Sequence, residues 1–82
     1  MTRAQKRSIS IDGHRTSISL EPAFWDALQE IARAGGSTLA ALVGRIDHTR
    51  GETGLSGALR VHVLEHYRRA ARATSGKPRP AQ

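Results

Sequence analysis

The stretch RTSISL at residues 15–20 decides the fold of this chain. Polar and apolar side chains alternate along it, and a period of two residues is typical of a half-buried β-strand. Alternate side chains of a strand point to opposite faces, so one face is expected to lie in the core and the other in solvent. The core face carries Thr16, Ile18 and Leu20, and the solvent face carries Arg15, Ser17 and Ser19.

A second alternating stretch, RSISI at residues 7–11, precedes the first. Asp12, Gly13 and His14 separate the two stretches. They form a turn signal, because Gly tolerates a positive φ and the Asp side chain can hydrogen-bond to the backbone beyond it. The two stretches can pair as a hairpin within the chain. The earlier stretch can equally be an arm that orders only on a partner, and the sequence is compatible with both arrangements.

Helical spacing of apolar residues predicts three helices after the strand. The first covers residues 22–34, because a proline suits its first turn and the glycine pair at residues 35 and 36 offers a left-handed cap at its end. Ser37 or Thr38 caps the second helix, which is expected to run to about Asp47.

The third helix is predicted to open at Ser56, after an exposed connection at residues 48–54 that holds no apolar residue. One apolar stripe of this helix is expected to pack on the core, while its charged residues remain in solvent. The stripe consists of Leu59, Val63, Leu64 and Tyr67, and the solvent-facing residues are Arg60, His62, Glu65 and Arg68.

The chain has 82 residues, a hydrophobic content of 38% and no cysteine. That length has room for a single domain, and so small a core offsets the conformational entropy of the chain only with difficulty. Neither a disulfide nor a thiolate metal site can add stability, so dimerisation is expected to supply it. The sequence shows no apolar run of membrane-spanning length and no secretory signal at residues 1–10, which predicts a cytoplasmic protein.

Lys and Arg outnumber Asp and Glu by 13 to 7, which gives a formal net charge of +6. This excess is typical of a protein that binds a polyanion, because each Lys or Arg that neutralises a phosphate releases condensed counterions. The basic residues gather near both ends of the chain. Double-stranded DNA is therefore the predicted partner, with the protein associated with the nucleoid.

The order of these elements resembles the ribbon-helix-helix fold. The resemblance lies in residues 15–20, in Leu28 and Ile31, and in the segment GSTLAALV at residues 36–43. With the segment SGALRVHVLEHY at residues 56–67, the chain is similar to short bacterial members that carry an additional C-terminal helix. The resemblance implies an α+β, mostly α, fold: an intertwined homodimer with a two-stranded antiparallel ribbon formed between the protomers.

The same resemblance implies sequence-specific binding of double-stranded DNA by a ribbon in the major groove, and repression of transcription. Arg15, Ser17 and Ser19 would read base edges, because Arg bonds bidentately to guanine and Ser donates or accepts. Phosphate contacts are expected from the first turn of the second helix, whose free amides make a partial positive charge, and from basic residues before the strand. The expected phosphate contacts are Gly36, Ser37, Thr38, Lys6 and Arg7, and the expected dimer core is Ile18, Leu20, Trp25, Leu28, Leu42, Val43 and Ile46.

Three regions are predicted: a basic N-terminal arm or extra strand at residues 1–14, the ribbon-helix-helix domain with its additional helix at residues 15–73, and a disordered basic tail at residues 74–82. If residues 7–11 pair with residues 15–20, they occupy one edge of the strand that the intermolecular ribbon needs. The ribbon could then be rebuilt from the earlier stretch. In that case Arg7, Ser8 and Ser10 would compete for the reading role.

A second class of function is a protein-interaction adaptor or antitoxin, whose third helix and tail engage another protein and whose DNA binding is weak or absent. No enzymatic function is predicted, because the sequence shows no convergent set of titratable groups. His62 and His66 are spaced i, i+4, but no third ligand has a position fixed by a motif, so no metal or cofactor is predicted. Beyond a homodimer, higher-order assembly on DNA is an open possibility.

Overall fold

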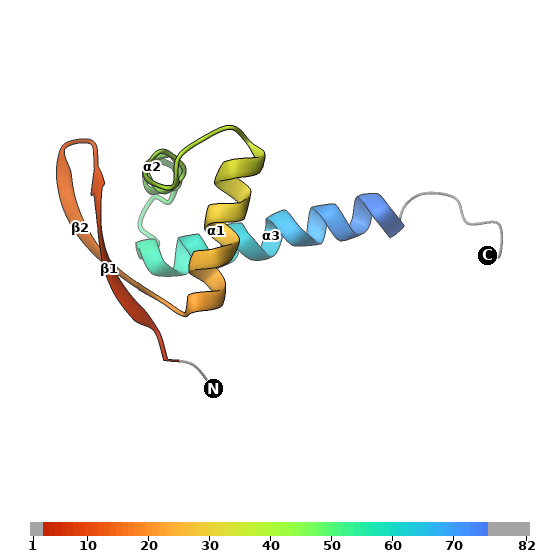
Figure 1. Cartoon of the computed structure of the whole chain (residues 1–82), viewed down its shortest axis with the longest axis horizontal. Helices are drawn as coiled ribbons and strands as arrows, with labels where there is room; N and C mark the ends of the chain where they lie inside the picture. The colour runs from red at the N-terminus through yellow and green to blue at the C-terminus, as the bar shows by residue number, and fades with distance from the viewer. Residues whose placement is uncertain (1–2, 76–82) are drawn as a thin grey trace.

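The computed structural model describes residues 3–75, which form a β-hairpin followed by three helices (Figure 1). The predicted α+β, mostly α, fold class is confirmed. The hairpin stands at one end of the molecule, α1 and α2 pack beside it, and α3 crosses beneath them and extends away from the body. The elements are β1 (Gln5–Ile11), β2 (His14–Leu20), α1 (Pro22–Ala34), α2 (Leu39–Thr49) and α3 (Leu55–Ser75).

The two alternating stretches pair with each other inside one chain. β1 and β2 are antiparallel, with a register that runs from Gln5 opposite Leu20 to Ile11 opposite His14. Asp12 and Gly13 connect them with φ values of 50° and 80°, and two successive positive φ angles match the twist that a two-residue hairpin turn requires. The hairpin arrangement is therefore the one adopted within the chain, with the predicted ribbon strand paired to the earlier stretch. The ribbon between two protomers, from either stretch, stays a prediction.

One face of the hairpin packs on the helices and forms the core with them. Ile18 and Leu20 have exposed fractions of 2% and 0%, and Ile11 of β1 joins them at 7%. All seven residues that were expected to form a dimer core are buried within the single chain. The buried cluster consists of Ile11, Ile18, Leu20, Trp25, Leu28, Ile31, Ala32, Leu42, Val43, Ile46, Leu59 and Val63.

Trp25 of α1 holds β1 against the body. Its side chain is fully buried, and its indole Nε1 donates a hydrogen bond of 3.1 Å to the backbone carbonyl of Gln5. The guanidinium of Arg7 lies 5.0 Å from the centre of the same ring, within the range of a cation–π contact. The first residues of β1 are thus attached to a helix that begins only after β2 has ended.

The first helix has the predicted bounds, whereas the later boundaries shift by one or two residues. α2 ends at Thr49 and not at about Asp47, and α3 begins at Leu55 and not at Ser56. Thr74 and Ser75, which were assigned to the disordered tail, are the last residues of α3. The rest of that predicted tail, residues 76–82, lies outside the described residues.

The predicted apolar stripe of α3 is only half correct. Leu59 and Val63 are buried at 0% and 7%, but Leu64 is 56% exposed and Tyr67 is 41% exposed. Leu64 follows Val63 directly and therefore lies about 100° around the helix from it, on a side that remains in solvent. Tyr67 instead lies along α1, where its hydroxyl donates a 3.1 Å hydrogen bond to Glu30. Within residues 3–75, no helix is both long and apolar enough to cross a membrane.

Arg60, which was expected to remain in solvent, fastens α3 to the start of α1. Its guanidinium donates to both carboxylate oxygens of Glu21 at 3.0–3.2 Å and lies 5.8 Å from the ring centre of Phe24. A backbone hydrogen bond of Glu21, followed by the hydrogen bond from Arg60, lowers the pKa of this carboxyl. The pair is bidentate, which is the geometry that gives an Arg–carboxylate contact its specificity.

The hairpin turn generates a stability prediction. A side chain at Gly13 would meet no atom within 4 Å, but its φ of +80° is strained for any residue with a Cβ. We expect Gly13→Ala to lower the free energy of unfolding by about 1–2 kcal/mol in urea denaturation. Gly57→Ala is the matched control, because Gly57 lies inside α3 with only an ordinary contact to Thr53, and there alanine should stabilise. Equal effects of the two substitutions would contradict the role given to the turn.

Candidate nucleic-acid interface

The register of the hairpin defines an outer ribbon face that points away from the helices. Residues opposite one another in an antiparallel pair share a face, so the side chains that oppose Arg15, Ser17 and Ser19 join them. Arg15 and Ser17 are exposed, and Ser19 is half-buried. The outer ribbon face consists of the pairs Lys6–Ser19, Ser8–Ser17 and Ser10–Arg15.

The outer ribbon face has the chemistry of a surface that approaches DNA. Its six side chains include two cations and no carboxylate, and four are serines whose small size permits close approach to a ligand. Lys6 and Arg15 lie on different strands and toward opposite ends of the register. Two seven-residue strands, each about 20 Å long, make a ribbon of the kind that the major groove of B-DNA admits.

Arg7 lies on the other face of the ribbon from Lys6. It opposes Ile18 in the register, its guanidinium stacks on Trp25, and Nη2 donates a 3.2 Å hydrogen bond to the side chain of Gln5. Sequence reasoning grouped Arg7 with Ser8 and Ser10 as rival base readers, but the register separates Arg7 from both. Of the two phosphate contacts predicted before the strand, Lys6 lies on the outer ribbon face and Arg7 packs on Trp25.

The three predicted phosphate contacts in the turn before α2 lie together at the start of that helix. Gly36 adopts a φ of 70°, and Thr38 is the N-cap, its Oγ1 accepting a 3.1 Å hydrogen bond from the amide of Ala41. Ser37 is half-buried, and its Oγ accepts a 3.4 Å hydrogen bond from Nη1 of Arg45. The amides of the first helical turn have no partner within the helix, so this end carries a partial positive charge.

Arg45 is a residue that sequence reasoning missed. It is exposed on α2, two turns after Thr38, and it lines a hollow of about 300 Å³ between β1 and α2. Ser10 and Asp12 line the hollow from the hairpin, and Ala40 and Ala41 line it from the first turn of α2. The start of α2 and the outer ribbon face therefore adjoin. The spacing i, i+7 from Thr38 is two helical turns, and it is a sequence signal that places Arg45 on the same side of the helix as its start.

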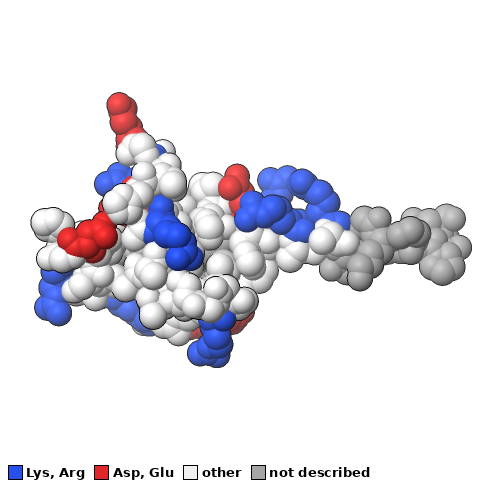
Figure 2. All heavy atoms as spheres, turned by 90° about the horizontal axis from the view of Figure 1, so that it is seen from above, with Lys and Arg blue, Asp and Glu red and all other residues white. Residues whose placement is uncertain are grey.

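Lys and Arg side chains also gather along the part of α3 that extends from the body, as Figure 2 shows from above. This basic α3 cluster consists of Arg68, Arg69 and Arg72, next to Glu65. The three Arg residues are exposed. The cluster lies on α3, apart from the outer ribbon face of the hairpin.

The N-cap generates a second prediction. Thr38→Ala removes the hydroxyl that accepts from the amide of Ala41, and we expect a loss of about 1 kcal/mol in the free energy of unfolding. Thr38→Ser keeps an oxygen at the same position and should retain most of the stability. Thermal and urea denaturation of the three proteins make the comparison. If the alanine and serine variants were equally unstable, the hydroxyl would not be the cap.

Comparison with known proteins identifies the family to which this chain belongs. The sequence profile of a family described as "Ribbon-helix-helix domain" matches residues 4–67. A solved structure, that of an uncharacterized protein from Bordetella pertussis Tohama I, superimposes with a TM-score of 0.69 at 34% sequence identity over 96% of this chain. The match covers 66% of the Bordetella chain, just under two thirds of its length. None of the curated proteins matches. The chain belongs to the ribbon-helix-helix family.

Proposed function

We propose that this protein binds double-stranded DNA in a sequence-specific manner and represses transcription by occupying an operator in the nucleoid. The observation that carries the proposal is the outer ribbon face, a carboxylate-free surface of Lys6, Arg15 and four serines on a two-stranded ribbon. The family supports it, because ribbon-helix-helix domains are a DNA-binding fold.

Within this proposal, both strands of the ribbon read bases. Arg15 reads guanine in the major groove, since its fork matches O6 and N7, and Ser17 and Ser19 read neighbouring base edges. Ser8 and Ser10 share the outer ribbon face with them and belong to the same reading surface. Lys6 and the start of α2 bind the phosphate backbone on either side, which orients the ribbon without reading sequence.

We further propose that the protein acts as a homodimer. Ribbon-helix-helix proteins typically bind DNA as dimers, and a dimer presents each reading residue twice to a palindromic or tandem site. A two-stranded sheet leaves one free edge on each strand, and an exposed edge can pair with a second copy. Ile18 and Leu20 are buried within one chain, so a charge there would unfold the protomer and would not test the dimer. Sedimentation equilibrium of the intact chain is the direct test.

Substitution of Arg15 tests the reading role. Duplexes selected from a random pool give a preferred site, and fluorescence anisotropy then measures affinity for that site and for a scrambled duplex. We expect Arg15→Ala to reduce the difference between the two by about 1–3 kcal/mol. Arg72→Ala removes the same charge from the far part of α3 and should leave the difference unchanged. Equal discrimination by the parent and by Arg15→Ala would overturn the assignment.

A protein-interaction adaptor that acts through α3 is the second candidate function. The observation in its favour is the exposure of Val61 and Leu64, at 51% and 56%, on a helix that extends from the body. Salt dependence separates the two functions. DNA retention that falls steeply from low to moderate salt and keeps a sequence preference supports the repressor, and no retention at low salt supports the adaptor.

A further inference from the structure

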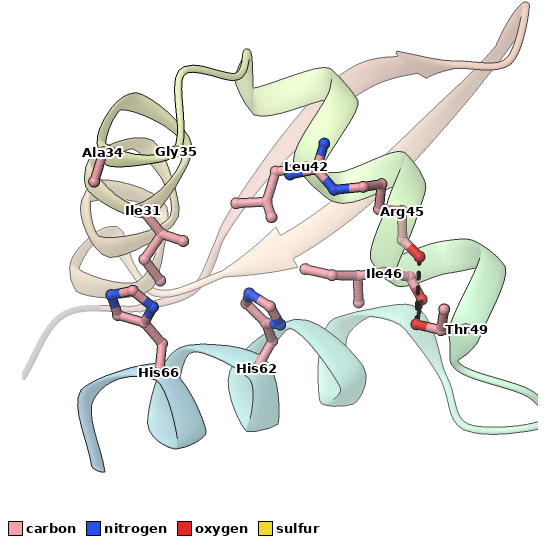
Figure 3. A pocket seen from close by; sticks show the side chains of 9 residues that line it. All are labelled: Ile31, Ala34, Gly35, Leu42, Arg45, Ile46, Thr49, His62 and His66. Atoms are coloured by element: carbon pink, nitrogen blue, oxygen red, sulfur yellow. Dashed lines mark hydrogen bonds between the residues drawn. The ribbon is translucent and has the colours of Figure 1, made fainter. Parts of the chain in front are cut away.

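The three helices leave an open groove of about 450 Å³ on their own side of the molecule (Figure 3). No residue of the hairpin lines it, so it is separate from the outer ribbon face. Its floor is apolar, with Ile31 of α1 and Leu42 and Ile46 of α2. The volume lies within the range of small-molecule sites, which combine an apolar lining with a few polar groups.

The rim of the groove carries basic side chains and no acidic one. His62 and His66 are one turn apart on α3, and both imidazoles point into the space between α1 and α2 (Figure 3). Arg45 lines the groove from α2. The remaining lining residues, Ala34, Gly35 and Thr49, carry no charge.

Among the charged groups around His62, the basic ones outnumber the acidic ones. Burial lowers the pKa of His62, and electrostatic interactions with His66 and Arg69 on the same helix and with Arg45 on α2 lower it further. Glu65 alone among the contributing groups opposes them, and α1 presents only Ile31, Ala34 and Gly35 to the groove. An anion in the groove would offset this accumulation of positive charge.

We propose that the groove binds a small amphipathic anion, an aliphatic or aromatic carboxylate. Its apolar body would lie on Ile31, Leu42 and Ile46, and its carboxylate would lie between the imidazoles of His62 and His66, with Arg45 adding positive charge. The charge of the rim also argues against a second copy of this chain as the occupant, because α3 itself is strongly basic. A carboxylate matches both the floor and the rim.

Octanoate is the probe for the test, with octylamine as its counterpart of the same chain length and opposite charge. Titration of the ¹⁵N-labelled intact chain by NMR should give saturable shifts at the groove residues with octanoate. Octylamine should bind at least about tenfold more weakly. The pKa of His62, followed through its imidazole resonances, should rise when octanoate is bound, because a neighbouring anion favours the imidazolium form.

Paired substitutions provide the matched control. His62→Gln with His66→Gln should weaken octanoate binding at least about tenfold. His14→Gln with His48→Gln makes the same chemical change at two histidines that do not line the groove, and it should leave binding unchanged. If the first pair does not fold, the rise in the pKa of His62 in the unsubstituted protein still decides the matter.

Several results would overturn the proposal. Equal binding of octylamine would show that only the apolar floor matters, and shifts away from the groove would place the site elsewhere. Shifts of the groove residues that depend on protein concentration, with no response to octanoate, would identify a second copy as the occupant. Binding of an acidic peptide without binding of octanoate would identify a protein partner.

A consequence for DNA rests on the proposed function. Arg45 lines both the groove and the hollow beside the hairpin, and it donates to Ser37 at the start of α2. Because it lies beside the start of α2, Arg45 would join that helix end in binding the DNA phosphate. A carboxylate that attracts Arg45 would withdraw it from there, so saturating octanoate should weaken DNA binding. Arg45→Gln should abolish that effect. If octanoate binds in the groove and DNA affinity does not change, the proposed link between the groove and DNA binding is wrong, but the carboxylate site is still supported. If the protein binds no DNA, the proposed function fails, and the NMR titration still tests the carboxylate site.

Discussion

The contact between Trp25 and the first residues of β1 is the constraint on which the rest of the structure depends. Trp25 is fully buried, bonds to the carbonyl of Gln5 and carries Arg7 on its ring. Truncating a buried aromatic side chain costs about 3–5 kcal/mol, whereas an exposed ion pair contributes about 0–1 kcal/mol. The attachment of β1 therefore depends on Trp25 far more than on an exposed pair such as Asp12 with His48.

The position of β1 determines which side chains form the outer ribbon face. Because β1 pairs with β2 in the same chain, a single chain presents a two-stranded ribbon with its polar pairs outward and its apolar residues on the helices. A slip of the register by one residue would turn Ile18 and Leu20 toward solvent and Arg15 toward the core. The core and the outer ribbon face are thus two results of one pairing.

The arginines of this protein serve two physical purposes that their charge alone does not distinguish. Arg7 and Arg60 pack on aromatic rings, and Arg60 also holds Glu21, so both fasten elements together. Arg15 and the basic α3 cluster face solvent. Arg45 shares features of both groups, because it donates a hydrogen bond to Ser37 and also lines the groove of α1, α2 and α3. The net charge of the chain therefore does not indicate which arginines hold elements together and which face solvent.

The sequence by itself determined the features that depend on neighbouring residues. Alternation over residues 15–20 predicted a strand and its two faces, and the proline and glycine signals predicted the exact bounds of α1, because period, capping and turn chemistry are local properties. Only the tertiary structure decided that β1 closes on β2, that Arg7 packs on Trp25, and that Leu64 and Tyr67 stay outside the core. Those outcomes depend on which distant element covers a given side. Trp25 bonds back to β1, and α3 extends beyond the place where α1 crosses it. The groove with His62 and His66 was beyond sequence reasoning for the same reason, since its walls come from three helices that meet only in space.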